Sequence, residues 1–260
     1  DILKKEILEL ENKFIFLRNK NSPTQSIGFK PSKNFKKMKH KIPMLSLDNA
    51  FNEEDIKNFE KKIFNFLSLN SKSDIEYSAE PKIDGISASL IYEDGKLKKG
   101  LSRGDGEEGE DITENLKTIK DIPTTINLKN FPKEIDIRGE VFIQNSDFNE
   151  IKENFANPRN AASGSLRQKD SKKTSKIPLR FIAYTYGYVK NMEIENQIDF
   201  LKNLKLWGFK INPLNAKIKG VKNLMLNHQS IEEKRKEIDF DIDGIVYKVN
   251  DFKTQKRLGF

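Results

Sequence analysis

Lys82 has the residue type and the setting of a nucleophile. It lies in the stretch EPKIDG, directly after a proline and two residues before Asp84, and a strand-like alternation of apolar and polar residues follows. A lysine amine is protonated at neutral pH, so a nucleophilic lysine needs burial or neighbouring cations that lower its pKa. The alternative is a solvated surface lysine that enters a turn, and this stretch alone does not decide between the two.

Two alternating segments carry charged side chains among apolar ones. In EIDIRGEVFI, Arg138 and Glu140 share the face opposite the isoleucines. This pattern indicates either a functional cluster or the solvated face of a half-exposed sheet. In FDIDGIVYKVN, Asp243 and Lys248 accompany an apolar strand. Lys248 could protect an edge strand from aggregation, or it could point into a cleft that binds phosphate.

Three arginines occur in glycine-rich or small-residue segments that can approach phosphate closely. SRGDGEEGEDITEN contains Arg103 among glycines and acidic residues, with a spacing that does not match the calcium loop of an EF-hand. We therefore interpret it as a nucleotide-contacting loop. FANPRNAASGSLRQ contains Arg159 and Arg167, whose guanidinium groups are suited to bidentate contacts with phosphate.

The elements that must position these residues are a mixture of helices and strands. Helical spacing predicts helices over 1–17, 52–68 and 198–209. Asn49 or Asn52 would cap the second of them. Alternation predicts strands over 75–82, 85–92, 96–102, 134–143, 180–189 and 240–250. Asp94–Gly95 would close a hairpin, and 19–34 has the composition of a linker. Hairpins interspersed with helices predict an α+β fold with antiparallel sheets flanked by helices.

Composition restricts the class of protein. The net charge of +8 and the pI near 9.3 favour a polyanionic partner, although a compositionally biased genome would also explain them. With no cysteine, the sequence excludes disulfides, a thiol nucleophile and cysteine-bound zinc, and two distant histidines (His40 and His228) form no evident metal site. No stretch is long and apolar enough for a membrane span, and the start lacks a signal-peptide pattern. We expect a cytoplasmic protein.

Seven blocks resemble, in order, the adenylation (nucleotidyltransferase) domain of the bacterial NAD⁺-dependent DNA ligases. They are MLSLDNAF, EPKIDG, SRGDGEEGEDITEN, IRGEVF, FANPRNAASGSLRQ, FDIDGIVYKV and LGF. The resemblance implies a nucleotidyltransferase (ATP-grasp-like) fold over 37–260, truncated at its C-terminus. Residues 1–36 would be a remnant of the N-terminal nicotinamide-recognition subdomain and its linker. Because that subdomain is incomplete, and a further active-site lysine would follow Phe260, the resemblance predicts poor use of NAD⁺ by this chain.

The resemblance implies a chemistry of three steps. Lys82 would attack the α-phosphate of NAD⁺ to give lysyl-AMP and release nicotinamide mononucleotide, and AMP would then pass to the 5′-phosphate of nicked DNA for sealing. Lys248, Arg103 and a bound Mg²⁺ would lower the pKa of Lys82 and stabilise the transition state. Asp84 would orient the amine or the metal.

The resemblance also implies which residues bind the nucleotide. Adenine would contact Glu80 and the backbone of Ser46 and Leu47. It would also stack on Tyr184 and pack on Val246. Glu140 would accept hydrogen bonds from the ribose. Asp243 and Lys248 match one family motif, with Lys248 near the α-phosphate. Phosphates of the adenylate or of DNA would be held by Arg159, Arg167 and Arg235. The sequence gives no metal ligand, and Arg235 could instead be an ordinary helix-surface arginine.

Two other functions remain open at this point. One is an ATP-dependent polynucleotide ligase or a capping-type nucleotidyltransferase. The other is a non-catalytic nucleic-acid-binding module, in which Lys82 would be only a phosphate contact. In either case the expected partners are nucleotides and nucleic acid, without a membrane, and we expect a monomer.

Overall fold

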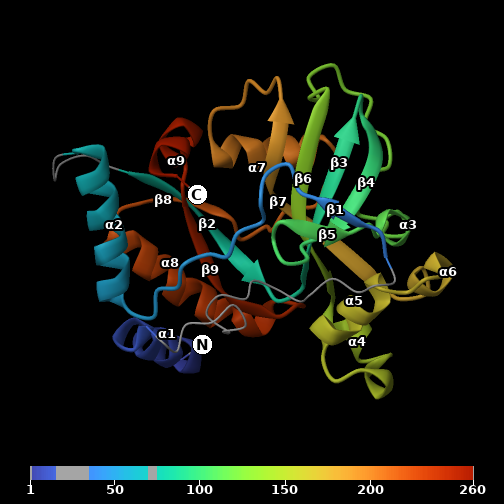
Figure 1. Ribbon diagram of the computed structural model, residues 1–260, viewed down its shortest axis with the longest axis horizontal. Coiled ribbons are helices and arrows are strands. Elements are labelled where there is room, and N and C mark those ends of the chain that lie inside the picture. The colour runs from blue at the N-terminus through green and yellow to red at the C-terminus, as the bar shows by residue number, and fades with distance from the viewer. Residues whose placement is uncertain (1, 16–34, 70–74, 260) are drawn as a thin grey trace.

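Two larger antiparallel sheets and one small one form a mixed α+β structure (Figure 1). The computed structural model describes residues 2–15, 35–69 and 75–259. The predicted linker over 19–34 and the final Phe260 of the LGF block lie outside the described residues. The α+β prediction with antiparallel sheets is confirmed.

The four-stranded sheet forms one half of the molecule. Its order is β4 (Lys96–Ser102), β3 (Ile86–Glu93), β6 (Glu134–Ile143) and β7 (Leu179–Lys190). The predicted Asp94–Gly95 turn joins β3 to β4, and both residues have positive φ, 46° and 73°. Such a turn matches the twist of antiparallel strands, which is why Asp-Gly favours a hairpin there. Strands β1 (Lys37–Lys39) and β5 (Glu108–Glu110) pair beside it as the small sheet.

Helices and aromatic side chains build the larger core on this sheet. α7 (Gln197–Leu206) packs on β7, and α5 (Pro158–Leu166) packs on β6 through Ala161 and Ala162. Edge-to-face contacts join Tyr92 to Phe209 with ring centroids 5.9 Å apart. Short helices α3 (Thr113–Leu116), α4 (Asn145–Phe148) and α6 (Ser171–Thr174) complete this half. The buried aromatic rings give the sheet a rigid support.

The three-stranded sheet forms the other half, in the order β8 (Ala216–Lys219), β2 (Glu76–Ile83) and β9 (Ile242–Val249). α2 (Glu53–Leu67), α8 (Val221–Lys234) and α9 (Phe252–Leu258) lie around it in Figure 1, with α1 (Ile2–Lys13) nearby. A smaller core between these helices and the sheet contains the fully buried Tyr77. The predicted helix over 52–68 is confirmed. Asn52 is its cap, because its side chain accepts from the backbone N–H of Asp55 at 2.9 Å.

Gly85 connects β2 of the three-stranded sheet to β3 of the four-stranded sheet. A Cβ at this position would lie 2.8 Å from Glu140 Cγ and would collide with the carbonyl oxygen of Val141. The neighbouring Asp84 N–H donates to the carbonyl of Asp241 at 2.8 Å. The junction is therefore fixed against β6 on one side and against the start of β9 on the other.

The charged face of β6 is buried, so the interpretation of a solvated face is wrong. Asp136, Arg138 and Glu140 are at most 9% exposed. Arg138 pairs with Asp136 at 3.1 Å and donates to the carbonyls of Ile42 and Pro43 (3.0 Å for Pro43). Alternation reveals which residues share a face, but only the covering segment reveals whether that face meets water.

Gly187 on β7 leaves the space that this buried arginine needs. A Cβ at Gly187 would lie 2.6 Å from Arg138 Cζ and would also collide with the Asp136 carboxylate. We expect Gly187→Ala to lower the free energy of unfolding by about 2 kcal/mol in urea denaturation, because it disturbs a buried ion pair in a packed site. Gly164→Ala is the control. Its Cβ would meet nothing closer than 3.8 Å on helix α5, so it should raise stability by up to about 1 kcal/mol. Equal effects of the two substitutions would contradict this explanation.

Candidate functional site

Lys82 lies near the end of β2, where it forms an ion pair with Asp243. The Lys82 ammonium donates to both carboxylate oxygens of Asp243, at 2.8 and 2.6 Å. The side chain of Lys82 is 45% exposed. Its Cα partner across the ladder is Gly244, so β9 brings Asp243 beside it. An accessible amine held by a carboxylate is thus the centre of the candidate site.

Lys248 and Arg103, the cations expected beside Lys82, have hydrogen-bond partners of their own in the structure. Lys248 is opposite Ser78, four residues along β2 from Lys82, or about 13 Å at the usual rise of a strand. Its ammonium bonds Glu80, and Arg103 donates to the carbonyl of Met44 at 3.1 Å. Both expected cations are engaged by acceptors of their own, and the nearest ionic partner of Lys82 is a carboxylate.

Asp84 and Arg159 form a second ion pair beside the first. Arg159 Nη1 donates to Asp84 Oδ1 at 2.6 Å. The arginine stands in the first turn of α5, which Asn157 caps by accepting from the N–H of Asn160 at 2.7 Å. Proline at the first helical position suits this start, because its missing N–H would have no helical partner. The capped helix start places Arg159 at the β2–β3 junction.

Glu140 on β6 is the buried carboxyl of the site. Burial raises the pKa of Glu140 to about 7, although a hydrogen bond from Ser87 (2.8 Å) and the charges of Arg159 and Lys82 oppose this effect. The charge of Asp243 adds to the rise. These electrostatic couplings show that side chains from β2, β6, β9 and α5 share one site.

Glu80, two residues before Lys82 on β2, is the centre of a buried polar cluster. It is 4% exposed, and its Oε1 accepts from Ser78 Oγ and from Gln197 Nε2, each at 2.9 Å. Its Oε2 accepts from Lys248 at 2.8 Å, and Lys248 also donates to the carbonyl of Tyr184 at 3.2 Å. Because Tyr184 belongs to β7, this cluster joins the two large sheets.

Tyr184 and Val246, two of the predicted base-contacting residues, lie at this cluster. The Lys248 ammonium is 5.4 Å from the centroid of the Tyr184 ring. Burial and the charge of Glu140 raise the pKa of the Tyr184 phenol, so the ring stays neutral. Val246 is half-buried and pairs with Glu80 across the ladder. Ser46 and Leu47 are exposed, two and three residues after the Met44 carbonyl that Arg103 holds.

Arg167 and Arg235 lie outside this set of contacts. Arg167, which ends α5, pairs with the buried Glu110 at 3.2 Å. Arg235 follows α8, and its Nη2 donates to the carbonyl of Ile242 at 2.6 Å. Arg235 is therefore more than an ordinary helix-surface arginine, because it braces the start of the strand that carries Asp243.

Three polar residues of the site were missed from the sequence: Ser78, Ser87 and Gln197. Ser87 lies directly opposite Glu140 in the β3–β6 register, so a correct strand pairing would have revealed it. Gln197 follows the helix cap Asn196, and its partner Glu80 is 117 residues earlier in the chain. No local pattern marks a contact of that kind.

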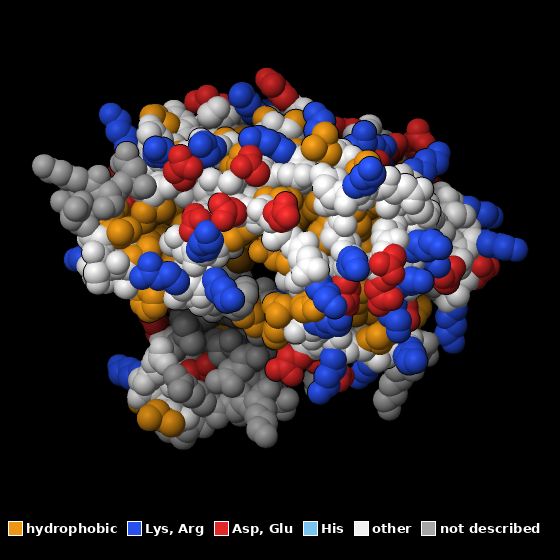
Figure 2. All heavy atoms as spheres, turned by 90° about the horizontal axis from the view of Figure 1, so that it is seen from above, with side chains coloured by type: hydrophobic (Ala, Val, Ile, Leu, Met, Phe, Trp, Pro, Cys, Tyr) orange, Lys and Arg blue, Asp and Glu red, His pale blue; other side chains and the backbone are white. Residues whose placement is uncertain are grey.

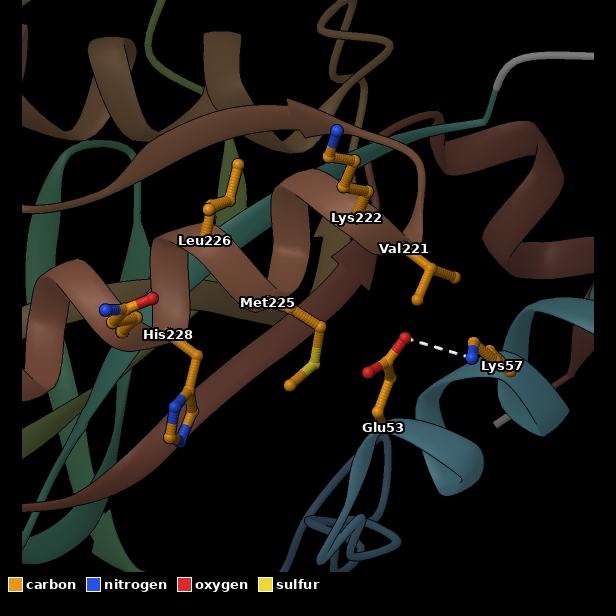
Figure 3. A pocket seen from close by; sticks show the side chains of 8 residues that line it. Glu53, Lys57, Val221, Lys222, Met225, Leu226 and His228 are labelled. Atoms are coloured by element: carbon orange, nitrogen blue, oxygen red, sulfur yellow. Dashed lines mark ion pairs between the residues drawn. The ribbon is translucent and has the colours of Figure 1, made fainter.

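A groove between α2 and α8 is distinct from this site (Figure 3). Its volume is about 430 Å³, and Val221, Met225, Leu226 and His228 line it from α8. Glu53 and Lys57 of α2 form an ion pair of 2.9 Å on its opposite side. None of the residues that line this groove is a predicted site residue.

Surface charge is mixed on the face that Figure 2 shows, with Lys and Arg side chains interspersed among acidic ones. A single continuous basic stripe does not dominate this face. Among the described residues, no helix has both the length and the apolar character that crossing a membrane requires.

Comparisons with curated proteins connect these features to DNA ligases. A protein of Pelagibacter ubique (strain HTCC1062) named "DNA ligase" is 76% identical over 260 residues, covering 100% of this chain and 38% of its own length. A "DNA ligase" of Bradyrhizobium sp. (strain ORS 278) is 46% identical over 268 residues, covering 100% and 37%. The chain thus spans less than two fifths of the length of these relatives.

A solved structure named "Pmar-Lig_Pre." aligns with 76% of this chain and 47% of its own, with 14% identity. Its TM-score of 0.41 is too low to support an argument. The family model described as "NAD-dependent DNA ligase adenylation domain" matches residues 32–260, which include both ion pairs and the Glu80 cluster. With most of its length matched, this chain belongs to the family of NAD-dependent DNA ligase adenylation domains.

Proposed function

We propose that this chain forms the lysyl-AMP intermediate of an NAD⁺-dependent DNA ligase on Lys82. Lys82 Nζ would attack the α-phosphorus of NAD⁺, a P–N bond would form, and the P–O bond to nicotinamide mononucleotide would break. AMP would then pass to the 5′-phosphate of nicked DNA, followed by sealing. The observation that carries this proposal is the accessible Lys82 amine, held by Asp243 beside the Asp84–Arg159 pair and Glu140.

In this proposal Asp243 holds the amine until the phosphate enters. An ammonium donates hydrogen bonds but has no lone pair for attack, so Lys82 must lose a proton and leave the carboxylate first. This requirement supports slow self-adenylation from NAD⁺ by this chain. Arg159 is the nearest described cation that pairs within the site, and we assign to it stabilisation of the charge that develops on the α-phosphate.

We propose that Glu80 and Lys248 read the edge of the adenine base. A carboxylate has about four acceptor positions and an ammonium has three protons. Three donors reach Glu80 and two acceptors engage Lys248, so one acceptor position and one proton remain. Adenine presents a 6-amino donor beside the N1 acceptor, which complements this pair. This geometry thus favours contact of the Lys248 ammonium with the adenine base over contact with the α-phosphate.

We further propose contacts of the site with the base, the ribose and the phosphates of the nucleotide. Tyr184 would stack on the base, Val246 would pack on it, and the Ser46–Leu47 backbone would contact it. Glu140 would accept from the ribose hydroxyls. Phosphates of the adenylate or of DNA would be bound by Arg103, Arg159, Arg167 and Arg235.

Mg²⁺ would enter with the substrate. The part of the chain that the structure describes contains no group of three or more His, Asp or Glu side chains placed to hold a metal. Mg²⁺ is often bound by one or two carboxylates together with substrate phosphates, and Asp84 is the carboxylate best placed for this. Bound there, the ion would supply charge stabilisation at the phosphate.

We also propose the domain division and the assembly. Residues 37–260 would form a nucleotidyltransferase (ATP-grasp-like) domain, which the start of β1 at Lys37 supports, and 1–36 would belong to a nicotinamide-recognition subdomain. The chain would act in the cytoplasm as a monomer, with nicked double-stranded DNA as the partner of the whole ligase.

Intact-mass measurement after incubation with NAD⁺ and Mg²⁺, or with ATP and Mg²⁺, tests the proposal. We expect slow addition of one AMP from NAD⁺ and none from ATP, with the adduct on Lys82 in peptide mapping. An adduct from ATP alone would identify an ATP-dependent enzyme. Salt-sensitive DNA binding without any adduct, even after long incubation, would favour a non-catalytic nucleic-acid-binding module.

A further inference from the structure

Gln197 is a fully buried glutamine that joins both large sheets. Its Nε2 donates to Glu80 Oε1 on β2 at 2.9 Å and to the carbonyl of Tyr184 on β7 at 2.7 Å. Both partners are acceptors, which fixes the orientation of the amide. Its backbone N–H donates to the carbonyl of Asn250 at 2.8 Å, directly after β9. The backbone of Gln197 is therefore tied to the segment after β9 and its amide nitrogen to both sheets, while its Oε1 is buried without a hydrogen-bond partner among the described residues.

Gln197 and Lys248 hold the same two acceptors from different sides. Lys248 donates to Glu80 Oε2 at 2.8 Å and to the Tyr184 carbonyl at 3.2 Å. Oε1 of Glu80 already accepts two hydrogen bonds, from Ser78 and Gln197, whereas Oε2 accepts one. The remaining acceptor position is thus on Oε2, next to the remaining proton of Lys248.

We propose that Gln197 is the positioning residue that sets the base specificity of this site. By occupying Oε1, it turns the free acceptor position of Oε2 toward the nucleotide. This inference rests on the proposed function, in which Glu80 and Lys248 read adenine. A Glu80 that has lost this donor can rotate and withdraw Oε2 from the base, which leaves the remaining proton of Lys248 to donate to a 6-oxo group. The site would then accept a 6-oxopurine as readily as adenine.

The test compares NAD⁺ with nicotinamide hypoxanthine dinucleotide, which has a 6-oxo acceptor and an N1–H donor in place of the adenine pattern. Dissociation constants are measured by calorimetry on the whole chain. We expect the wild-type protein to prefer NAD⁺ at least about tenfold, and Gln197→Met to lose about tenfold of this preference, the typical effect of one hydrogen bond to a charged group. Gln197→Glu keeps the size of the side chain but replaces the donor by an acceptor, so it should lose the preference as well.

Gln255→Met is the matched control. Gln255 is a partly buried glutamine that donates to the carbonyl of Val249 at 2.6 Å, away from Glu80, so its replacement should leave the ratio unchanged. Melting temperatures establish that each variant is folded. If neither Gln197 variant folds, Ser78→Ala removes the other neutral donor from Oε1 and should also lower the preference.

The outcomes separate two failures. In the first case the wild-type protein prefers NAD⁺, and the folded Gln197 variants (or Ser78→Ala in their place) keep the same ratio of the two dissociation constants. This result would overturn the positioning role of Gln197. If the wild-type protein binds both dinucleotides equally or neither of them, the proposed adenine site itself fails.

Discussion

Replacing Lys82 with arginine is expected to abolish AMP transfer to the protein while the fold remains intact. A guanidinium stays protonated and can still pair with Asp243, but it has no lone pair for attack on phosphorus. Loss of the nucleophile in other covalent enzymes lowers the rate on the order of 10⁶-fold, which here means loss of the adduct below detection. The measurement is the intact mass after long incubation with NAD⁺ and Mg²⁺.

Lys217→Arg is the control for this substitution. Lys217 is similarly exposed (51%) and pairs with Glu76 at 3.2 Å, on the same three-stranded sheet. In the Lys217→Arg variant, the AMP adduct on Lys82 should form as it does in the wild-type protein. Calorimetry with NAD⁺ should show that Lys82→Arg still binds the dinucleotide. An AMP adduct that persists in Lys82→Arg, on Lys248 or on any other lysine, would refute the assigned nucleophile.

Glu140→Gln is expected to stabilise the protein at neutral and alkaline pH but not in acid. The pKa of Glu140 is about 7 in the folded protein, against its ordinary value of 4.5. Below about pH 4.5 the carboxyl is protonated in both the folded and the unfolded state, and it has no effect on stability. Between pH 4.5 and 7 only the unfolded state ionises, so native stability falls. Above pH 7 the carboxyl ionises in both states, and its burial lowers the free energy of unfolding by the full amount of about 3 kcal/mol.

The glutamine removes this cost because its amide does not ionise, and its oxygen can still accept from Ser87. Urea unfolding at pH 4 and pH 8 measures the difference. The variant should match the wild-type protein at pH 4 and exceed it by up to about 3 kcal/mol at pH 8. Glu233→Gln, at an exposed position on α8, should show no such dependence on pH. A difference that is the same at both pH values would show that burial of Glu140 does not perturb its ionisation.

The sequence predicted the six longer strands but not how they are covered. Alternation defined β6 and its two faces correctly, yet Arg138 proved to be buried under the segment that contains Ile42 and Pro43. Burial of a face depends on segments distant in sequence, which a local period does not contain. Helix α8 and the helical form of α5 were not predicted either, because neither segment was recognised as periodic.

The candidate site was predictable only in part for the same reason. Lys82, Asp243 and Glu140 lie in short strand motifs whose residue types already indicate chemistry. Their mutual contacts, and the contact of Gln197 with Glu80, connect residues more than 100 positions apart or strands in different sheets. The action of Lys248 and Arg103 on Lys82 came from the family resemblance and stays a prediction; the structure shows the acceptors that each of the two cations meets.

The tight junction at Gly85 restricts which substitutions this chain can accept there. No side chain fits there without displacing Glu140 or the backbone of Val141, so the spacing of the two sheets is set by the main chain itself. A different spacing of the sheets would therefore require movement of the main chain at this junction, whereas the polar contacts around Glu80 and Lys82 can be altered by substitution of side chains alone.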